Sequence, residues 1–344
     1  MTVSPAPVLT IERLSVTIRT EREPLTVVED LSMSVAPDEV TCIVGESGSG
    51  KSVTMLSVMR LMDERAVEYS GAVQFEGRNL LALTAAEMER VRGSGIAMIF
   101  QDPMTALNPV YRIGWQIEEQ IRAHAALTRK EARARALTLL QSVGISDPER
   151  RLGSYPHQLS GGMRQRVMIA LALSCQPKIL IADEPTTALD VTIQAQILRL
   201  IGKLKSETGM AVILVTHDMG VVAEIADQVR VMYGGRVVEE GTTAEIFADP
   251  RHPYTRGLLA CIPRLLGPRP DRLPSISGVP AAAGQIGAGC VFAARCPHRF
   301  APCDVQPALS AAGTASHRVA CHLPDAAGKP AHLQPGNAGP GGVP

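Results

Sequence analysis

The sequence predicts an α/β fold with a mostly parallel sheet that is covered by helices on both faces. Short apolar runs alternate with longer helix-like segments, which is the pattern of βαβ units. The clearest of these runs are residues 40–44, 179–183, 211–216 and 229–233. A glycine-rich loop at residues 45–52 lies directly between the first run and a Met- and Leu-rich segment at residues 52–62. These two observations predict a sheet with a loop suited to phosphate at the end of one strand.

Two further patterns extend this fold. Residues 8–20 alternate apolar and polar side chains, and the same period of two returns from Leu31 onward, so we expect antiparallel strands at one edge of the domain. Residues 71–75 add another strand. Residues 113–143 place apolar side chains at helical spacing, which predicts a helical subdomain inserted at about residues 106–176.

The composition divides the chain into three parts. After Pro250 prolines multiply, the periodicity fades and cysteines appear, so we place a domain boundary there. This boundary gives a main domain over residues 1–250 and a Cys-rich region over residues 251–324. Residues 325–344 consist mainly of Gly, Pro and Ala, and we expect them to be disordered because they cannot bury apolar surface.

Charge and hydropathy exclude some classes of protein. Lys+Arg and Asp+Glu both number 34 in this 344-residue chain, so no bulk charge calls for nucleic acid or an acidic membrane surface. No apolar run approaches the roughly 18 residues needed to span a bilayer, and the N-terminus lacks the pattern of a signal peptide. We therefore expect a cytosolic protein, in which the 7 cysteines would rarely form structural disulfides.

The loop at residues 45–52 matches G-x-x-x-x-G-K-[ST] in full. Its glycines allow a tight turn, so that consecutive N–H groups and the next helix N-terminus point at one anionic spot. Lys51 would reach the outer phosphates, and the Ser52 hydroxyl would help to hold Mg²⁺. A Gly/Ser-rich linker is the alternative, and the flanking strand and helix disfavour it. The predicted nucleotide-binding residues are Gly45, Glu46, Ser47, Gly48, Ser49, Gly50, Lys51, Ser52 and Val53.

Further motifs follow the loop in a set order. Gln101 comes after one apolar strand, Asp183 and Glu184 close another, and His217 ends a third. Residues 159–166 read Leu-Ser-Gly-Gly-Met-Arg-Gln-Arg. Together with the loop, this order resembles the ATP-binding subunits of ABC transporters. The resemblance implies a P-loop NTPase fold of the ABC ATPase type, with an antiparallel edge subdomain, a helical insertion and a small Cys-rich C-terminal extension.

The resemblance also implies a role for each of these residues. Asp183 would hold Mg²⁺ through water, with Ser52 as a further ligand. Gln101 would reach Mg²⁺ or the attacking water, and it counts with Glu184 and His217 among the expected catalytic residues. Glu184 would orient or deprotonate the attacking water, and His217 would contact the terminal phosphate and steady Glu184. Taken singly, two acids at a strand end and a histidine before a helix could be ordinary polar features. Their joint order with the phosphate loop favours the catalytic roles.

The Ser-Gly-Gly stretch opens a long helix whose N-terminus offers free N–H groups and the positive end of the helix dipole. In the family this helix tip contacts the γ-phosphate bound to the opposite subunit. One complete site therefore needs two chains packed head to tail, and a lone monomer should hydrolyse ATP poorly. The residues assigned to this contact are Ser160, Gly161, Gly162 and Met163, with Asp190 in the D-loop.

The adenine contact departs from the family pattern. The family usually stacks adenine on an aromatic residue of the edge strands, yet no Phe, Tyr or Trp precedes Tyr69. An aliphatic residue could take this role, or an arginine such as Arg22, because guanidinium planes also stack.

Several stretches resemble one branch of the family, the oligopeptide/dipeptide importers. They are residues 101–109, 155–159, 252–259 and 289–297. This resemblance implies a subunit that powers import of peptides, or of a related solute such as a metal chelate or glutathione. Its partners would be a second, similar ATPase subunit, two integral membrane permease subunits and an extracytoplasmic solute-binding protein, at the cytoplasmic face of the cell membrane. Residues 162–168 resemble the first of the two ATPase types, which predicts a heterodimer.

Four cysteines lie in the C-terminal region without the C-x₂-C pairs of zinc ribbons. Four thiolates on a segment with little core suit a metal centre. The resemblance favours a [4Fe–4S] cluster over Zn²⁺, and merely buried thiols are the alternative. The expected ligands are Cys290, Cys296, Cys303 and Cys321, with His317 and His322 as spare candidates. Cys42, Cys175 and Cys261 are expected to be core residues.

Two other functions are less compatible with the sequence. A soluble ABC-type ATPase that acts on DNA or the ribosome usually carries two cassettes or a long coiled-coil insertion, and this sequence has neither. A non-catalytic regulator with a metal-sensing tail would not need Lys51, Asp183, Glu184 and His217 together. We therefore expect an ATPase of a transporter, with ATP and Mg²⁺ as cofactors and no nucleic-acid partner.

Overall fold

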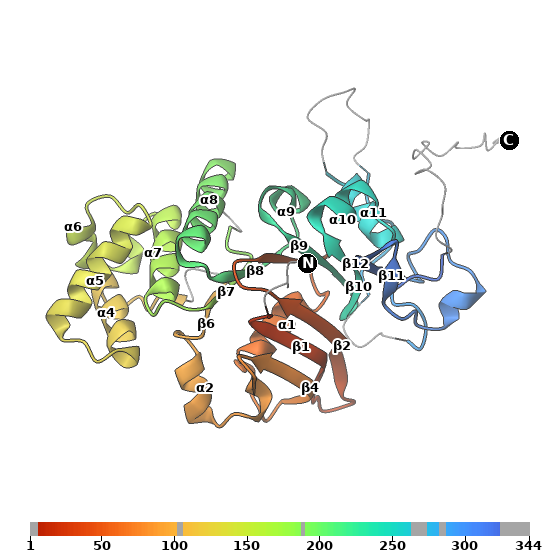
Figure 1. The fold of residues 1–344 in the computed structure, drawn as a ribbon, viewed down its shortest axis with the longest axis horizontal. Coiled ribbons are helices and arrows are strands. Elements are labelled where there is room, and N and C mark those ends of the chain that lie inside the picture. Colours follow the sequence, from red (N-terminus) through yellow and green to blue (C-terminus); the bar gives the residue numbers. More distant parts are fainter. Residues whose placement is uncertain (1–5, 102–105, 187–189, 263–273, 282–286, 324–344) are drawn as a thin grey trace.

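The structure is a computed structural model that describes residues 6–101, 106–186, 190–262, 274–281 and 287–323. Two sheets organise it. An eight-stranded sheet has the order β11-β12-β10-β9-β3-β8-β7-β6, and a four-stranded sheet has the order β2-β1-β4-β5. The helices α4 to α7 lie at one end of the molecule and the C-terminal region lies at the other, with the larger sheet between them (Figure 1).

Five neighbouring strands of the larger sheet, from β9 to the edge strand β6, are parallel. They pair in the order β9, β3, β8, β7, β6, so that the carboxyl ends of all five meet at one edge. Their residues are almost all buried because helices and the small sheet cover both faces. The strands are β3 (Val40–Val44), β6 (Ile96–Ile99), β7 (Ile179–Asp183), β8 (Ala211–Thr216) and β9 (Gln228–Tyr233). The predicted parallel sheet is confirmed.

The small sheet is antiparallel and lies beside α1. Its strands are β1 (Leu9–Ile18), β2 (Leu25–Val35), β4 (Val67–Phe75) and β5 (Arg78–Asn79). The alternation seen in the sequence places Leu9, Ile11 and Leu14 in a core shared with α1 (Lys51–Val58). Helix α1 ends earlier than the sequence predicts, because Arg60 takes a left-handed φ of 48°.

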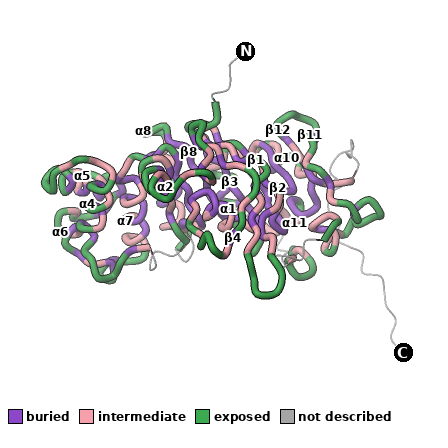
Figure 2. Tube along the Cα trace, turned by 90° about the horizontal axis from the view of Figure 1, so that it is seen from below, coloured by how far each residue is buried: buried purple, intermediate pink, exposed green. Residues whose placement is uncertain are grey.

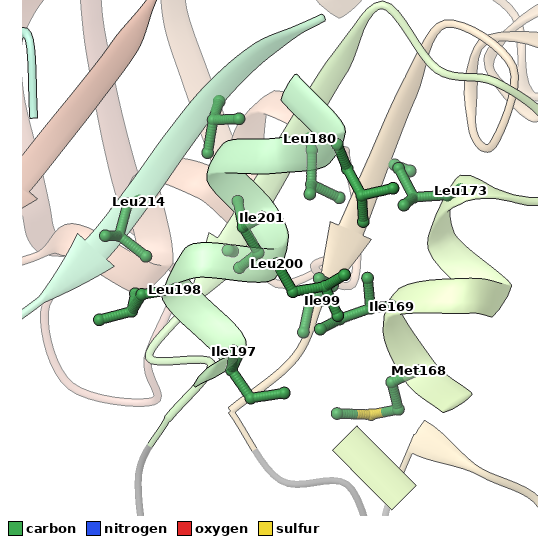
Figure 3. Packing of buried hydrophobic residues seen from close by; sticks show 14 of the residues in the cluster. Ile99, Met168, Ile169, Leu173, Leu180, Ile197, Leu198, Leu200, Ile201 and Leu214 are labelled. Carbon is green, nitrogen blue, oxygen red and sulfur yellow. The ribbon is translucent and has the colours of Figure 1, made fainter. Parts of the chain in front are cut away.

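Helix α7 of the helical subdomain packs onto the sheet beside α8, a helix that follows the subdomain in the chain. Figure 3 shows Met168, Ile169 and Leu173 of α7 beside Ile197 of α8 and Ile99 of β6. The apolar face of each helix is thus buried against the same core, which fixes the position of the helix tips. The helices here are α4 (Ile113–His124), α5 (Arg129–Ser142), α6 (Pro148–Leu152), α7 (Gly161–Leu173) and α8 (Val191–Thr208).

The remaining helices are short and lie around the sheets. They are α2 (Ala85–Val91), α9 (Met219–Ile225), α10 (Thr243–Ala248) and α11 (Pro253–Ala260), with 3₁₀ turns at Leu80–Ala82, Pro156–Gln158 and Ala301–Asp304. Buried residues follow the strands and α1, while exposed residues gather on the loops and the outer helices (Figure 2). Within the described ranges, no helix combines the length and apolar character needed to cross a membrane.

The C-terminal region extends the larger sheet, a feature the sequence does not predict. Its added strands are β11 (Ser310–Ala312) and β12 (Thr314–Val319), which continue the sheet from β10 (Arg236–Thr242) of the main domain. Strand β12 pairs antiparallel with β10, placing Val319 opposite Glu239. Its sequence, Thr-Ala-Ser-His-Arg-Val, is mainly polar and carries no apolar alternation. Phe292 is buried in the core of the larger sheet, so this region shares a core that the sequence does not reveal.

Three of the sequence expectations fall on residues that the structure does not describe. The expected disordered tail at 325–344 lies wholly outside the described residues. Residues 102–105, which follow Gln101, and residues 187–189, which precede Asp190, also lie outside them.

Candidate nucleotide-binding site

The candidate site forms at the edge where the parallel strands end. Lys51 follows β3, His217 follows β8, Asp183 is the last residue of β7 and Gln101 follows β6 closely. Because β3, β8, β7 and β6 are neighbours in that order, these side chains converge although Lys51 and His217 lie 166 positions apart in the sequence. This is the crevice at which open α/β sheets bind ligands.

The phosphate loop is compact and closes around the Lys51 ammonium group. Lys51 Nζ donates hydrogen bonds to the carbonyl oxygens of Gly45 at 2.7 Å and Glu46 at 2.8 Å, and to Ser49 Oγ at 3.3 Å. Burial lowers the pKa of Lys51, and the nearby carboxylates of Glu184, Asp183 and Glu46 oppose this shift. A buried, fixed ammonium group of this kind suits the outer phosphates of a nucleotide.

Two glycines are required by the geometry of this loop. A Cβ on Gly45 would lie 2.2 Å from the carbonyl oxygen of Met232 on β9, so the loop can approach that strand only without a side chain. Gly50 has a left-handed φ of 97°, and its Cβ would lie 3.0 Å from the carbonyl oxygen of Val27. Glycine at both positions lets α1 begin directly against the loop.

Ser52 and Asp183 form the candidate Mg²⁺ site. The Ser52 hydroxyl donates a hydrogen bond of 3.0 Å to Asp183 Oδ1. Burial raises the pKa of Asp183, the hydrogen bond from Ser52 opposes this effect, and the charge of Glu184 adds to it. A buried carboxylate beside a hydroxyl and an ammonium group offers the oxygen donors that Mg²⁺ prefers, so the residues present fit this ion.

Glu184 is held from two neighbouring strands. Its Oε2 accepts a hydrogen bond of 3.0 Å from Gln101 Nε2, and its Oε1 lies 3.1 Å from His217 Nδ1. Its backbone N–H donates to the carbonyl oxygen of Val215 at 2.9 Å, and its φ of 45° is left-handed. Such a conformation is costly for a non-glycine residue and is typical of functional sites. The backbone therefore aims this carboxylate away from Asp183 and toward the histidine.

The structure places Gln101 beside Glu184. Its amide contacts Glu184, whereas the Ser52 hydroxyl is the group that contacts Asp183. Gln101 thus reaches the expected water-activating carboxylate. Its assignment as a Mg²⁺ ligand stays a prediction, as do the other residue roles.

The Ser-Gly-Gly stretch lies at the start of α7, in the helical subdomain (Figure 1). Ser160 caps the helix by accepting a hydrogen bond of 3.3 Å from the Met163 N–H. Ser160 and Gly161 are exposed. A Cβ on Gly162 would lie 3.1 Å from Ile193 Cγ2, and Ile193 donates its N–H to Asp190 Oδ1 at 2.9 Å. The signature helix and Asp190 are therefore linked through one residue of α8.

Arg22 is exposed in the connection between β1 and β2. The Arg22 N–H donates a hydrogen bond of 3.3 Å to the Thr20 hydroxyl, which fixes the backbone there but leaves the Arg22 side chain on the surface. Its contact with adenine stays a prediction.

The four C-terminal cysteines gather in one place. The Cys290 N–H donates a hydrogen bond of 2.9 Å to the Cys303 carbonyl oxygen. Burial raises the pKa of Cys321, and the other three thiols raise it further. However, among the described residues no three His, Cys, Asp or Glu side chains lie in metal-binding geometry. The thiols have the right chemistry for a metal centre, but their arrangement does not fit one.

The two spare histidine ligands point elsewhere. His317 Nε2 lies 2.8 Å from buried Glu239 Oε1, and His322 Nε2 lies 2.8 Å from the Val305 carbonyl oxygen. Of the three other cysteines, Cys42 is fully buried, as the sequence predicts. Cys175 and Cys261 are only half-buried, although the sequence predicts that they are core residues.

The structure also adds residues that the sequence does not assign to the site. Tyr254, at the start of α11, accepts a hydrogen bond of 2.8 Å from the Glu46 N–H. Arg295, in the C-terminal region, forms an ion pair with the Glu46 carboxylate. Both lie more than 200 positions away from Glu46 in the sequence. Their spacing carries no signal, and only the shared sheet brings them to the loop.

Comparison with known proteins agrees with this geometry. Residues 28–187 match the ABC transporter family model, and residues 238–303 match the model for the C-terminal region of oligopeptide/dipeptide transporters. A Brucella melitensis protein whose name describes a peptide import ATP-binding protein is 49% identical over 327 residues, which is 94% of this chain and 98% of that protein. A Sinorhizobium fredii protein named for a peptide ABC transporter is 51% identical over 298 residues, covering 84% of this chain and 89% of that protein.

Solved structures of ABC proteins share the fold. The dimeric structure of the ATP-binding cassette MJ0796 bound to ADP and Pi has a TM-score of 0.62 and 28% identity, covering 68% of this chain and 98% of that chain. The cbiO1 protein from Clostridium perfringens has a TM-score of 0.61 and 29% identity, and the match covers 71% of this chain and 91% of that chain. The chain therefore belongs to the ATP-binding proteins of ABC transporters, within the group that carries the oligopeptide/dipeptide transporter C-terminal region.

Proposed function

We propose that this chain hydrolyses ATP to power the import of peptides, or of a related small solute, through separate membrane subunits. One observation supports the proposed hydrolysis: the Glu184 carboxylate lies between Gln101 and His217. The residue before Glu184 is Asp183, which accepts a hydrogen bond from Ser52 of the phosphate loop. The peptide import names of close relatives support the choice of transport over action on nucleic acid.

The residues of this chain divide the chemistry among them. Lys51 and the loop N–H groups hold the phosphates, and Ser52 with Asp183 would hold Mg²⁺. When bound, that ion neutralises charge that develops on the phosphates. Glu184 takes the proton of the attacking water or orients this water, and His217 holds the carboxylate in place from the next strand.

The site is completed by a second ATPase subunit. The exposed N-terminus of α7, capped by Ser160, offers N–H groups and a positive dipole end that suit a phosphate. Packed head to tail with a similar but different chain, it would contact the γ-phosphate held by that chain. Closure on ATP and reopening after hydrolysis would then drive the membrane subunits.

An apolar surface next to Gln101 suits the permease. Phe100 and Leu61 are 38% and 42% exposed. A hollow of about 240 Å³ lies beside Phe100 and Leu61. Exposed apolar clusters of this kind mark interaction sites. Since Gln101 follows Phe100 and contacts Glu184, docking there could reach the catalytic carboxylate.

Two experiments test this function. Co-purification of the full chain should recover membrane permease subunits, at the cytoplasmic face of the cell membrane, together with a second ATPase. In vesicles that hold this complex and the solute-binding protein, uptake of a labelled peptide should need ATP and should stop with Glu184→Gln. Recovery of ribosomes or DNA instead, or peptide uptake that continues without this chain, would contradict the proposal. Competition by a metal chelate or glutathione would identify a different solute.

A metal centre on the four C-terminal thiols is a separate part of this proposal. The thiols gather, but the described arrangement does not satisfy a coordination sphere, so they would have to close around a [4Fe–4S] cluster or Zn²⁺. An absorption spectrum and metal analysis of anaerobically purified protein test this. Iron with visible absorption, or zinc without it, would support a centre, whereas protein free of both metals would leave only buried thiols.

A further inference from the structure

Every polar group of Glu46 in the phosphate loop is engaged. Its N–H donates to Tyr254 Oη at 2.8 Å, and its carbonyl oxygen accepts from Lys51 Nζ at 2.8 Å. Its carboxylate pairs with Arg295. One residue of the loop thus connects the phosphate-binding lysine to two side chains that lie beyond the parallel sheet.

Arg295 is built into this position. Its side chain is only 4% exposed, and it meets Glu46 with two contacts, Nη1 to Oε2 at 2.5 Å and Nη2 to Oε1 at 3.2 Å. Its Nε donates to the Ser277 carbonyl oxygen at 2.8 Å, and Nη2 also donates to the Ile276 carbonyl oxygen at 3.1 Å. A guanidinium group held on both sides in this way is pre-organised for a bidentate carboxylate contact.

An aromatic cluster supports both contacts. Tyr233 at the end of β9, Tyr254 of α11 and Phe292 of the C-terminal region pack together, with ring centroids 4.7 to 5.4 Å apart. Tyr254 and Phe292 are at most 2% exposed, and the Arg295 guanidinium lies 5.7 Å from the Tyr233 ring centroid. Rings packed this closely resist rearrangement, so the C-terminal region presents a fixed surface to the loop.

We propose that Arg295 and Tyr254 are positioning residues for the phosphate loop, and that the C-terminal region sets the affinity for ATP through Glu46. This inference rests on the proposed function in one respect, namely that the loop and Lys51 bind ATP. Arg295 lies between Cys290 and Cys296, so the segment that carries two of the thiols is also the segment that braces the loop.

Charge gives the proposal a direction. Glu46 is a carboxylate within the loop that must accept phosphates, and Arg295 offsets its charge. Without Arg295 this carboxylate would be unpaired close to the phosphates, which it would repel, and the Glu46 side chain would lose its fixed position. Removing the arginine should therefore harm ATP binding more than removing both partners.

The test compares four full-length variants with the unmodified protein. They are Arg295→Ala, Arg295→Lys, the double variant Glu46→Gln with Arg295→Ala, and the control Arg299→Ala. Arg299 lies in the same segment and pairs with Asp304, but both side chains are more than half exposed and neither contacts the loop. The readouts are the equilibrium Kd for ATP, the KM and kcat of hydrolysis in the complex with the second ATPase subunit, and the thermal unfolding midpoint without nucleotide.

We expect Arg295→Ala to raise the Kd and KM for ATP about tenfold with little change in kcat. The double variant should recover to within about threefold of the unmodified protein, because the repelling carboxylate is gone. Arg295→Lys should lie between, since it keeps the charge but not the fork, and Arg299→Ala should match the unmodified protein.

Three results would overturn the inference. They are an unchanged Kd for ATP in folded Arg295→Ala, a double variant that binds ATP no more tightly than Arg295→Ala, and a loss of ATP affinity that is explained by a lower unfolding midpoint. If Arg295→Ala does not fold, the Kd of Arg295→Lys decides the matter. An unmodified protein that fails to bind ATP would instead refute the proposed function, so the two failures are distinguishable.

Discussion

The nucleotide edge of the sheet and the C-terminal region are built in different ways. At the nucleotide edge, each side chain follows a buried parallel strand, so short sequence motifs determine where Lys51, Asp183 and His217 meet. In the C-terminal region, loops and polar strands are held by a shared core and by ion pairs such as Arg295 with Glu46. Local motifs are therefore enough to predict which side chains meet where regular parallel strands position them. They are not enough where contacts between distant segments position the side chains.

The largest expected effect lies at the nucleotide edge. Glu184→Gln keeps the shape of the side chain but removes the general base, so turnover should fall about a thousandfold while ATP still binds. Turnover is measured by phosphate release from the full complex. Glu224→Gln, an exposed glutamate on α9, serves as the control. Hydrolysis at the unmodified rate would show that the assigned base is wrong.

Lys51→Ala should weaken ATP binding at least about a hundredfold, because a buried ammonium group that faces the phosphates is removed. Equilibrium binding of ATP to the full chain measures this loss. The control is Lys203→Ala on α8, whose side chain is 65% exposed. Binding that survives the change at Lys51 would place the phosphates elsewhere.

The C-terminal region should prove to be part of the same folding unit as the sheet. Phe292→Ala removes a ring that is 2% exposed and contacts Tyr233 and Tyr254, so the free energy of unfolding should fall by about 3–5 kcal/mol. The matched change Phe300→Ala, at a ring that is 38% exposed, should cost less than about 1 kcal/mol. Equal losses in chemical denaturation would argue that the region packs independently.

The smallest expected effect concerns pH. The hydrogen bond from His317 to Glu239 raises the pKa of His317 above its ordinary 6.5. The stability contributed by this charged pair is fully present below pH 6.5 and is lost as the pH rises through the raised value. His317→Asn should therefore lower the unfolding free energy more in mild acid than at alkaline pH, as measured by urea unfolding over a pH series. His298→Asn, at an exposed histidine, controls for the loss of an imidazole, and a difference independent of pH would contradict the assignment.

The sequence predicted the parallel sheet and the residues at its edge because buried strands are apolar along their whole length and the phosphate loop needs its glycines. It could not predict β12, whose six residues are mainly polar, because its pairing with β10 is set by the partner strand and by the His317 contact. It also missed Arg295 and Tyr254. Their role depends on contacts across about 250 and 208 positions, which no local pattern records.

We propose above all that the edge formed by β3, β8, β7 and β6 binds ATP and hydrolyses it with a second subunit. The most direct measurement is an experimental structure of the Glu184→Gln variant, in its full complex, with ATP and Mg²⁺. We predict phosphates against Lys51 and the loop N–H groups, Mg²⁺ beside Ser52 and Asp183, and the helix tip of the partner subunit against the γ-phosphate. ATP bound away from Lys51, or a γ-phosphate facing no second subunit, would contradict the account.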